Sequence, residues 1–202
     1  YDTIFYDRND DLKTTNSFKG GRKHGLWIEY FDKEKETQSS SKRHKYYRLI
    51  EYNEGKVKGL IYDFYEDGRL ERIGASTDGN PHMRNGYFEW YYESGKLMLT
   101  ADYQNDKVHG TEKEYYESGK LYRVSKYKNG LESGREVFYY ENGNKKFEID
   151  YRFGQWHGTY KAYYENGNPK YERSYQSGLF CGNMKEWSEE GYIETSVTCD
   201  AC

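Results

Sequence analysis

Residues 110–133 read GTEKEYYESGKLYRVSKYKNGLES, and this stretch decides the fold. Two tyrosine-rich runs of about seven residues flank Glu-Ser-Gly-Lys, and aromatic residues suit the pleated surface of a strand. Glycine recurs too often for a helix. A two-residue type I′ turn needs positive φ at both central residues, which Asn and Gly tolerate. The stretch therefore predicts a β-hairpin, closed by a second turn at Lys128-Asn129-Gly130.

The same pattern recurs every 24 residues without a gap. Its opening glycines are Gly86, Gly110, Gly134, Gly158 and Gly182. Further units open at Gly25 and Gly59 after longer steps, so extra residues lie at about 33–45 and 76–82. We predict one repeat domain over residues 1–202, in which seven units follow a partial unit at 1–24 and precede a tail at about 196–202.

The pairing also predicts which side chains share a face. A two-residue turn at Ser118-Gly119 places Glu117 opposite Lys120 and Tyr116 opposite Leu121. Positions 2, 4, 6, 11, 13, 15 and 17 after each opening glycine then lie on one face, predicted to be apolar, and the other face is mostly charged. Since one hairpin cannot bury its own face, stability must come from its neighbours. The predicted fold is all-β: an elongated single-layer antiparallel β-meander of tandem hairpins.

Composition narrows the function classes. Only 35% of the 202 residues are hydrophobic and 19% are aromatic, with 25 tyrosines, so a thick aliphatic core of the usual enzyme kind is excluded. The net charge is -3, and no basic block predicts a nucleic-acid partner. No apolar run approaches the ~18 residues of a membrane-spanning helix. Because the sequence opens at Tyr1 without a Met, we expect an upstream piece, and the compartment stays open between cytoplasmic and secreted or envelope-associated.

The repeated motifs carry a family resemblance. Tyr-Tyr-Glu-Ser-Gly-Lys-Leu, Tyr-Tyr-Glu-Asn-Gly-Asn and the closing His109-Gly110 and His157-Gly158 resemble the bacterial variant of the MORN repeat, as in the YwqK-type antitoxin family. The resemblance covers nearly the whole chain. It implies an elongated β-meander without an active site and, for the named members, neutralisation of a toxin by binding it. The sequence departs from the pattern at both insertions, at Lys145 and Pro169 where leucine is expected, and in its cysteine-bearing tail.

Candidate chemistry is sparse. His24, His109 and His157 share one repeat position, but equivalent positions lie about 10 Å apart per repeat, too far for ligands of one metal ion. We expect these histidines to shape the turns. Cys199 and Cys202 are read as a minor tail, with a local disulfide as the alternative, and Cys181 stands alone. We predict no enzyme activity, no catalytic or metal-binding residues and no cofactor.

Two groups of residues are candidates for binding. The aromatic face contributes Phe88, Trp90, Tyr92, Phe138, Tyr140 and Tyr164, and the first insertion contributes Lys42, Arg43, His44 and Lys45. The rings either cover a thin sheet or form a recognition surface. The insertion is expected to lie outside the strand ladder, either as a specificity loop or as a hairpin tip without a role.

These observations lead to two function hypotheses. The first is a non-enzymatic protein-binding module, with an antitoxin or immunity-type role toward a toxin partner. The alternative is a secreted or envelope-associated scaffold that binds glycan or a membrane surface through its aromatic rows.

Overall fold

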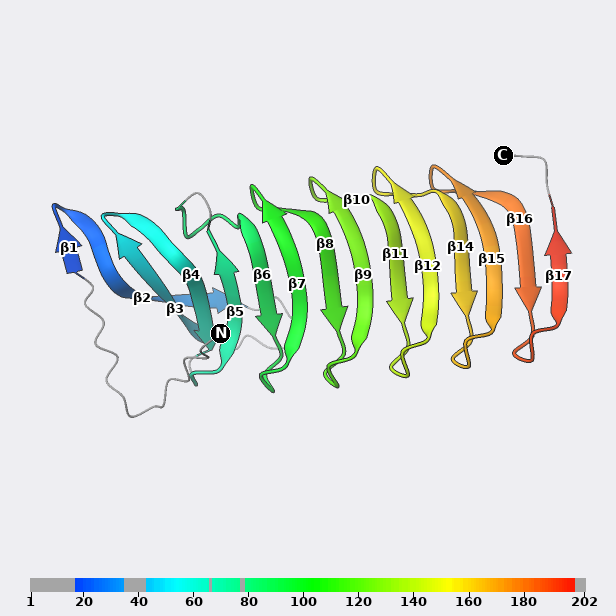
Figure 1. Cartoon of the computed structure of the whole chain (residues 1–202), viewed down its shortest axis with the longest axis horizontal. Coiled ribbons are helices and arrows are strands. Elements are labelled where there is room, and N and C mark those ends of the chain that lie inside the picture. The colour runs from blue at the N-terminus through cyan, green and yellow to red at the C-terminus, as the bar shows by residue number, and fades with distance from the viewer. Residues whose placement is uncertain (1–16, 35–42, 66, 77–78, 199–202) are drawn as a thin grey trace. The chain divides into compact units, whose positions relative to one another are not determined.

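The computed structural model describes residues 17–34, 43–65, 67–76 and 79–198, with the backbone alone at 30–34 and 43–46 (Figure 1). Every strand pair in the described residues is antiparallel, and these residues contain no helix. The chain divides into two compact units, residues 1–96 and residues 97–202. We call these unit 1 and unit 2.

Unit 1 is a meander in which each strand pairs with the next along the chain. Its strands are β1 (Ser17–Lys19), β2 (Arg22–Glu34), β3 (Arg43–Asn53), β4 (Lys56–Tyr65), β5 (Leu70–Ala75) and β6 (Gly86–Tyr91). Ile50, Tyr52 and Ile61 form its buried cluster, against which Trp27 and Val57 pack. Aliphatic and aromatic burial is thus concentrated on β3 and β4.

The first insertion differs from its prediction. Strands β2 and β3 continue into it, with Lys33 paired with His44 and Glu34 paired with Arg43. The expectation that residues 33–45 lie outside the strand ladder is therefore wrong at both ends. The backbone pairing also sets Asp32 opposite Lys45, so the ladder runs without a register shift from Gly25 to Glu34.

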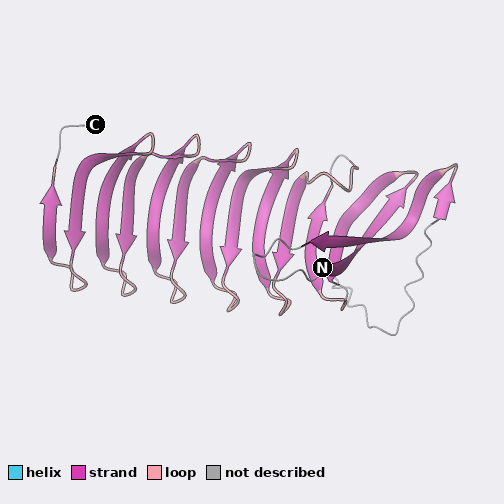
Figure 2. Cartoon of the chain, turned by 180° about the vertical axis from the view of Figure 1, so that it is seen from behind, coloured by secondary structure: helices cyan, strands magenta, loops and turns pink. Residues whose placement is uncertain are grey.

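Unit 2 is itself an antiparallel meander in one layer, seen from behind in Figure 2. Its long strands are β7 (Leu97–Gln104), β8 (Lys107–Tyr115), β9 (Leu121–Lys128), β11 (Gly134–Tyr139), β12 (Lys145–Arg152), β14 (Gly158–Tyr163), β15 (Pro169–Gln176), β16 (Leu179–Trp187) and β17 (Ile193–Val197). Two short strands, β10 (Leu131–Glu132) and β13 (Gln155–Trp156), follow turns. The predicted all-β, single-layer meander of tandem hairpins is confirmed.

The turns at the two edges of unit 2 are of different types. Tyr116 carbonyl accepts the Gly119 N–H at 2.8 Å, and only Gly119 has positive φ there, so this turn is type I followed by a left-handed glycine. Two-residue turns with positive φ at both residues occur at the opposite edge, as at Asn129 and Gly130. The predicted type I′ turn at Ser118-Gly119 is wrong because Ser118 keeps negative φ.

This turn changes the pairing beside it. Gly110 pairs with Tyr127 and Glu114 pairs with Arg123, as the predicted register requires. A register shift between Glu114 and Tyr115 then sets Tyr115, rather than Tyr116, opposite Leu121. The faces therefore follow the prediction along the strands and depart from it next to the turn.

The opening glycine of each repeat marks a second irregularity. Gly110 has φ +96°, within the region that favours glycine, and lies where the ladder between β7 and β8 shifts register. The other opening glycines also have positive φ, from +80° at Gly25 to +112° at Gly86. The glycine recurs because this bulge strains other residues.

Candidate binding face

The aromatic candidates of unit 1 lie in different environments. Phe88 is 2% exposed, and its ring covers Gly74, where an added Cβ would lie 1.9 Å from ring atoms. Trp90 is half-buried beside Phe88, with ring centroids 5.9 Å apart. Tyr92 is half-buried, and its backbone closes the turn with Lys96. Phe88 is therefore buried in the sheet, because a glycine on β5 leaves room for its ring, and its role as a contact stays a prediction.

Tyrosines at position 6 join neighbouring repeats in unit 2. The hydroxyl of Tyr140 donates to the carbonyl of Tyr163 at 2.9 Å, and the hydroxyl of Tyr164 donates to the carbonyl of Trp187 at 2.9 Å. Tyr116 makes the same bond to Tyr139 at 2.7 Å. Burial raises the pKa of Tyr140 and of Tyr116, in keeping with neutral hydroxyl donors. We call these bonds the tyrosine ties.

Asparagines at the type I turns make a parallel set of bonds. The side-chain amides of Asn142 and Asn144 both donate to the carbonyl of Glu165, at 2.7 and 2.9 Å. One repeat further on, Asn166 and Asn168 donate to the carbonyl of Glu189. The recurring Asn-Gly-Asn spacing marks these asparagines in the sequence, where they were predicted only to form turns.

Phe138 belongs to a row of rings across unit 2. It stacks on Phe147 with centroids 4.2 Å apart and meets Tyr122 edge-on at 5.4 Å. The row continues through Tyr160, Trp156, Tyr175 and Phe180, with successive centroids 5.0 to 5.9 Å apart. Such ring pairs stabilise a face beyond their buried area, by about 0.5–1.5 kcal/mol each. Phe138 is half-buried in this row.

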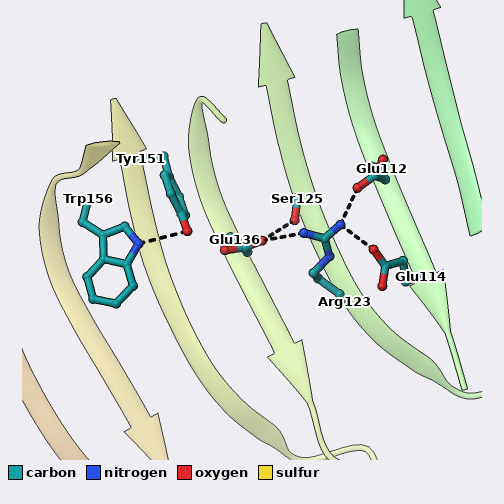
Figure 3. Close-up of polar contacts among 7 residues, drawn as sticks. All are labelled: Glu112, Glu114, Arg123, Ser125, Glu136, Tyr151 and Trp156. Carbon is teal, nitrogen blue, oxygen red and sulfur yellow. Dashed lines mark hydrogen bonds and ion pairs between the residues drawn. The ribbon is translucent and has the colours of Figure 1, made fainter. Parts of the chain in front are cut away.

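A polar cluster lies on β8, β9 and β11 (Figure 3). The Arg123 guanidinium contacts Glu112 at 2.5 Å, Glu136 at 3.0 Å and also Glu114. Ser125 Oγ donates to Glu136 Oε1 at 2.7 Å. Glu112 is 7% exposed and Glu136 is 5% exposed. The prediction that this face is apolar therefore fails in these repeats, where charged residues at facing positions of neighbouring strands pair with one another.

This cluster holds three carboxylates and one guanidinium. Burial raises the pKa of Glu112, and the charges of Glu114 and Glu136 add to the rise, which Arg123 opposes. Burial alone would lower the pKa of Arg123, but Glu114 and its other neighbours raise it overall. Burial also raises the pKa of Tyr127 to about 12, with a further contribution from Glu112. These contacts link three strands, so we assign the cluster a structural role.

The histidines take part in backbone geometry. His109 Nδ1 accepts the Asn129 N–H of the following turn at 3.3 Å, and the His157 N–H donates to the Asp150 carbonyl at 2.8 Å. The His24 carbonyl accepts from Trp27 Nε1 at 3.2 Å. Within residues 17–34, 43–65, 67–76 and 79–198, no group of three or more His, Cys, Asp or Glu side chains is placed to hold a metal ion.

The remaining predictions concern cysteines and the first insertion. Cys181 is buried and disulfide-bonded, so the interpretation that it stands alone is wrong. Cys199, Cys202 and Lys42 lie outside the described residues. Strand β3 begins with Arg43, His44 and Lys45. Their role in binding stays a prediction.

Comparison with known proteins identifies the repeat. Residues 84–105, 108–129, 132–152 and 156–177 each match the family model of the MORN repeat variant. The second match spans most of β8, the type I turn and β9, which is one hairpin. No curated protein matches the chain. The MORN-repeat part of the resemblance is confirmed for these four stretches. In the described part of the chain, no helix is long and apolar enough to cross a membrane.

Proposed function

We propose that this chain is a non-enzymatic protein-binding module whose partner is a toxin, which it neutralises as an antitoxin or immunity protein. MORN repeats are in general modules that bind proteins or membranes. The observation that carries the proposal lies in unit 2, where charged groups pair within the sheet while large apolar side chains face solvent. Phe153 is 77% exposed and Leu179 is 74% exposed. Exposed aromatic and aliphatic groups on a rigid repeat are suited to contact with another protein.

The test is purification of the tagged chain from its native host, followed by identification of stoichiometric partners. We expect one protein partner that inhibits growth when expressed alone and is tolerated when this chain is co-expressed. A stoichiometric partner that is not toxic would contradict the antitoxin role but would still support a protein-binding module. Turnover of a small substrate by the purified chain, without any protein partner, would contradict the proposal.

The alternative role as a glycan-binding or membrane-binding scaffold is supported by the ring row from Tyr122 to Phe180. Half-exposed rings can stack on sugar rings, and seven rings follow one another along unit 2. Glycan-array and vesicle-binding measurements test this role. Saturable glycan binding that is lost in Trp156→Ala would favour it over a protein partner.

A further inference from the structure

Three successive two-residue turns lie along one edge of unit 2 (Figure 1), and each of them holds or directly precedes an exposed apolar residue. Leu131 is 52% exposed, and Phe153 and Leu179 are more exposed still. The turns are stacked, because the Gly154 N–H donates to the Glu132 carbonyl at 3.0 Å and the Gly178 N–H donates to the Trp156 carbonyl at 2.8 Å. Leu131 reaches over the next turn, where its Cδ2 would lie 3.6 Å from a Cβ built on Gly154. We call Leu131, Phe153 and Leu179 the apolar edge.

Phe153 is unfavourable at its position in two ways. Its φ is +53°, a left-handed conformation that is rare for bulky residues, and the equivalent turn positions hold Asn105, Asn129 and Ser177. Its ring is also largely in solvent. A short polar residue would remove both costs. Strained residues of this kind cluster at functional positions, so the outlier points to a role outside the fold.

Cations surround the apolar edge. Lys107 and Lys128 are exposed beside the turns, and the Arg152 guanidinium lies 5.7 Å from the centre of the Phe153 ring. No carboxylate forms a salt bridge with these three cations within the described residues. The edge therefore presents apolar side chains together with three cations that form no salt bridge within the described residues, and the carboxylates of Asp106 and Glu132 lie on the same edge.

From this geometry we infer that the apolar edge, with Lys107, Lys128 and Arg152, is the docking surface for a protein segment in which apolar residues alternate with carboxylates. This inference rests on the proposed function and names the surface and the partner chemistry. A second copy of the chain would offer this edge only two carboxylates, Asp106 and Glu132, against its three cations. A uniformly anionic lipid surface would be repelled by Asp106 and Glu132, which lie on the same edge. An acidic and apolar peptide segment satisfies both features.

The test is selection of random peptides displayed on phage against the full chain, with each selected peptide then measured against variants. We expect selected peptides to combine Leu, Phe or Trp with Asp or Glu. We expect their affinity to fall by at least about tenfold in L131S/F153N/L179S and to weaken as salt screens the cations. The matched control, Y192S/I193T/V197T, replaces exposed apolar residues on β17 and directly before it, and should bind as the parent does.

Phe153→Asn alone separates a docking role from a folding role. Asn tolerates the left-handed conformation, so the variant should unfold at higher urea than the parent while binding the peptides more weakly. Loss of both stability and binding would contradict the inference.

Three other outcomes would overturn the docking surface. In the first, the selected peptides lack acidic residues or bind L131S/F153N/L179S as tightly as the parent. In the second, the chain binds phosphatidylserine vesicles and no peptides. In the third, the chain self-associates and the triple variant does not. If the native partner binds the triple variant as tightly as the parent, the docking surface is wrong while the proposed function stands.

Discussion

Units 1 and 2 are both antiparallel meanders, yet different side chains are buried in them. In unit 1 the buried residues are chiefly large and apolar, such as Leu49, Ile50 and Ile61. In unit 2 small residues such as Ala101 and Ala162 are buried together with Ser125 and three glutamates. Unit 2 contains three tyrosine ties, each of which reaches the same position of the next repeat.

This difference explains where the repeat is strict. A tyrosine tie has a fixed reach, so an extra residue between Tyr116 and Tyr139 would move the acceptor carbonyl away from the hydroxyl. Apolar packing is not directional and accommodates irregular spacing. The longer steps after Gly25 and Gly59 both fall in unit 1. In unit 2 the regular spacing thus keeps each tyrosine hydroxyl within reach of its acceptor carbonyl.

The largest effect is expected from Arg123→Met in unit 2. The substitution leaves Glu112 and Glu136 buried without their cation, and breaking a buried ion pair in this way costs about 3–5 kcal/mol. Urea unfolding near neutral pH measures the loss. Adding Glu112→Gln and Glu136→Gln should recover part of it, and no recovery would show that Arg123 acts by packing alone.

Ile50→Ala should be next in size and tests the apolar core of unit 1. Ile50 is fully buried, so the truncation should lower the free energy of unfolding by about 2–5 kcal/mol. Leu60→Ala on the neighbouring strand is the control, since Leu60 is exposed and its loss should cost much less. Equal urea midpoints for the two variants would argue against a core centred on Ile50.

Tyr140→Phe tests one tyrosine tie and should lower the free energy of unfolding by about 1 kcal/mol. The control is Tyr139→Phe, which removes the hydroxyl of the preceding residue and should change stability by less than about 0.5 kcal/mol. Urea unfolding of both variants makes the comparison. Equal losses in the two would mean that the bond to the Tyr163 carbonyl adds nothing to stability.

The smallest effect concerns pH and Glu112. Its pKa is raised in the folded state by burial, so the folded state binds the proton more tightly than the unfolded state does. The resulting contribution to the free energy of unfolding is present in full below the pKa of Glu112 in the unfolded state. It is lost as the pH rises through the pKa of Glu112 in the folded state. Glu112→Gln should therefore lower the urea midpoint at mildly acidic pH relative to the midpoint at neutral pH, compared with the parent. A relative rise of the midpoint at mildly acidic pH would contradict the assignment.

The sequence predicted the hairpins and their main register, because the spacing of Gly110 and Tyr127 specifies both. It did not predict the type I turns. Both Ser-Gly and Asn-Gly occur in type I′ turns and in type I turns followed by a left-handed glycine, and the residue before the pair does not distinguish the two. The burial of Phe88 could have been inferred from Gly74, a strand residue without a side chain.

The polar cluster was harder to predict. Glu112, Glu114 and Arg123 are at facing positions of one hairpin, but Glu136 comes from the next repeat. The contact of Glu136 with Arg123 depends on the register between β9 and β11, which the sequence of a single hairpin does not specify. The exposed Phe153 in a left-handed turn was equally hidden, because the sequence there has no Asn-Gly pair to mark the turn.

The tyrosine ties also bear on how such a chain can change over generations. Each repeat between Gly110 and Trp187 gives one hydroxyl bond to the repeat after it, and the last hairpin has Ser188 at the donor position. A duplicated or deleted segment of 24 residues would leave every remaining donor facing an equivalent carbonyl. Unequal recombination in whole repeats can thus alter the length of the array without disturbing the joints on either side.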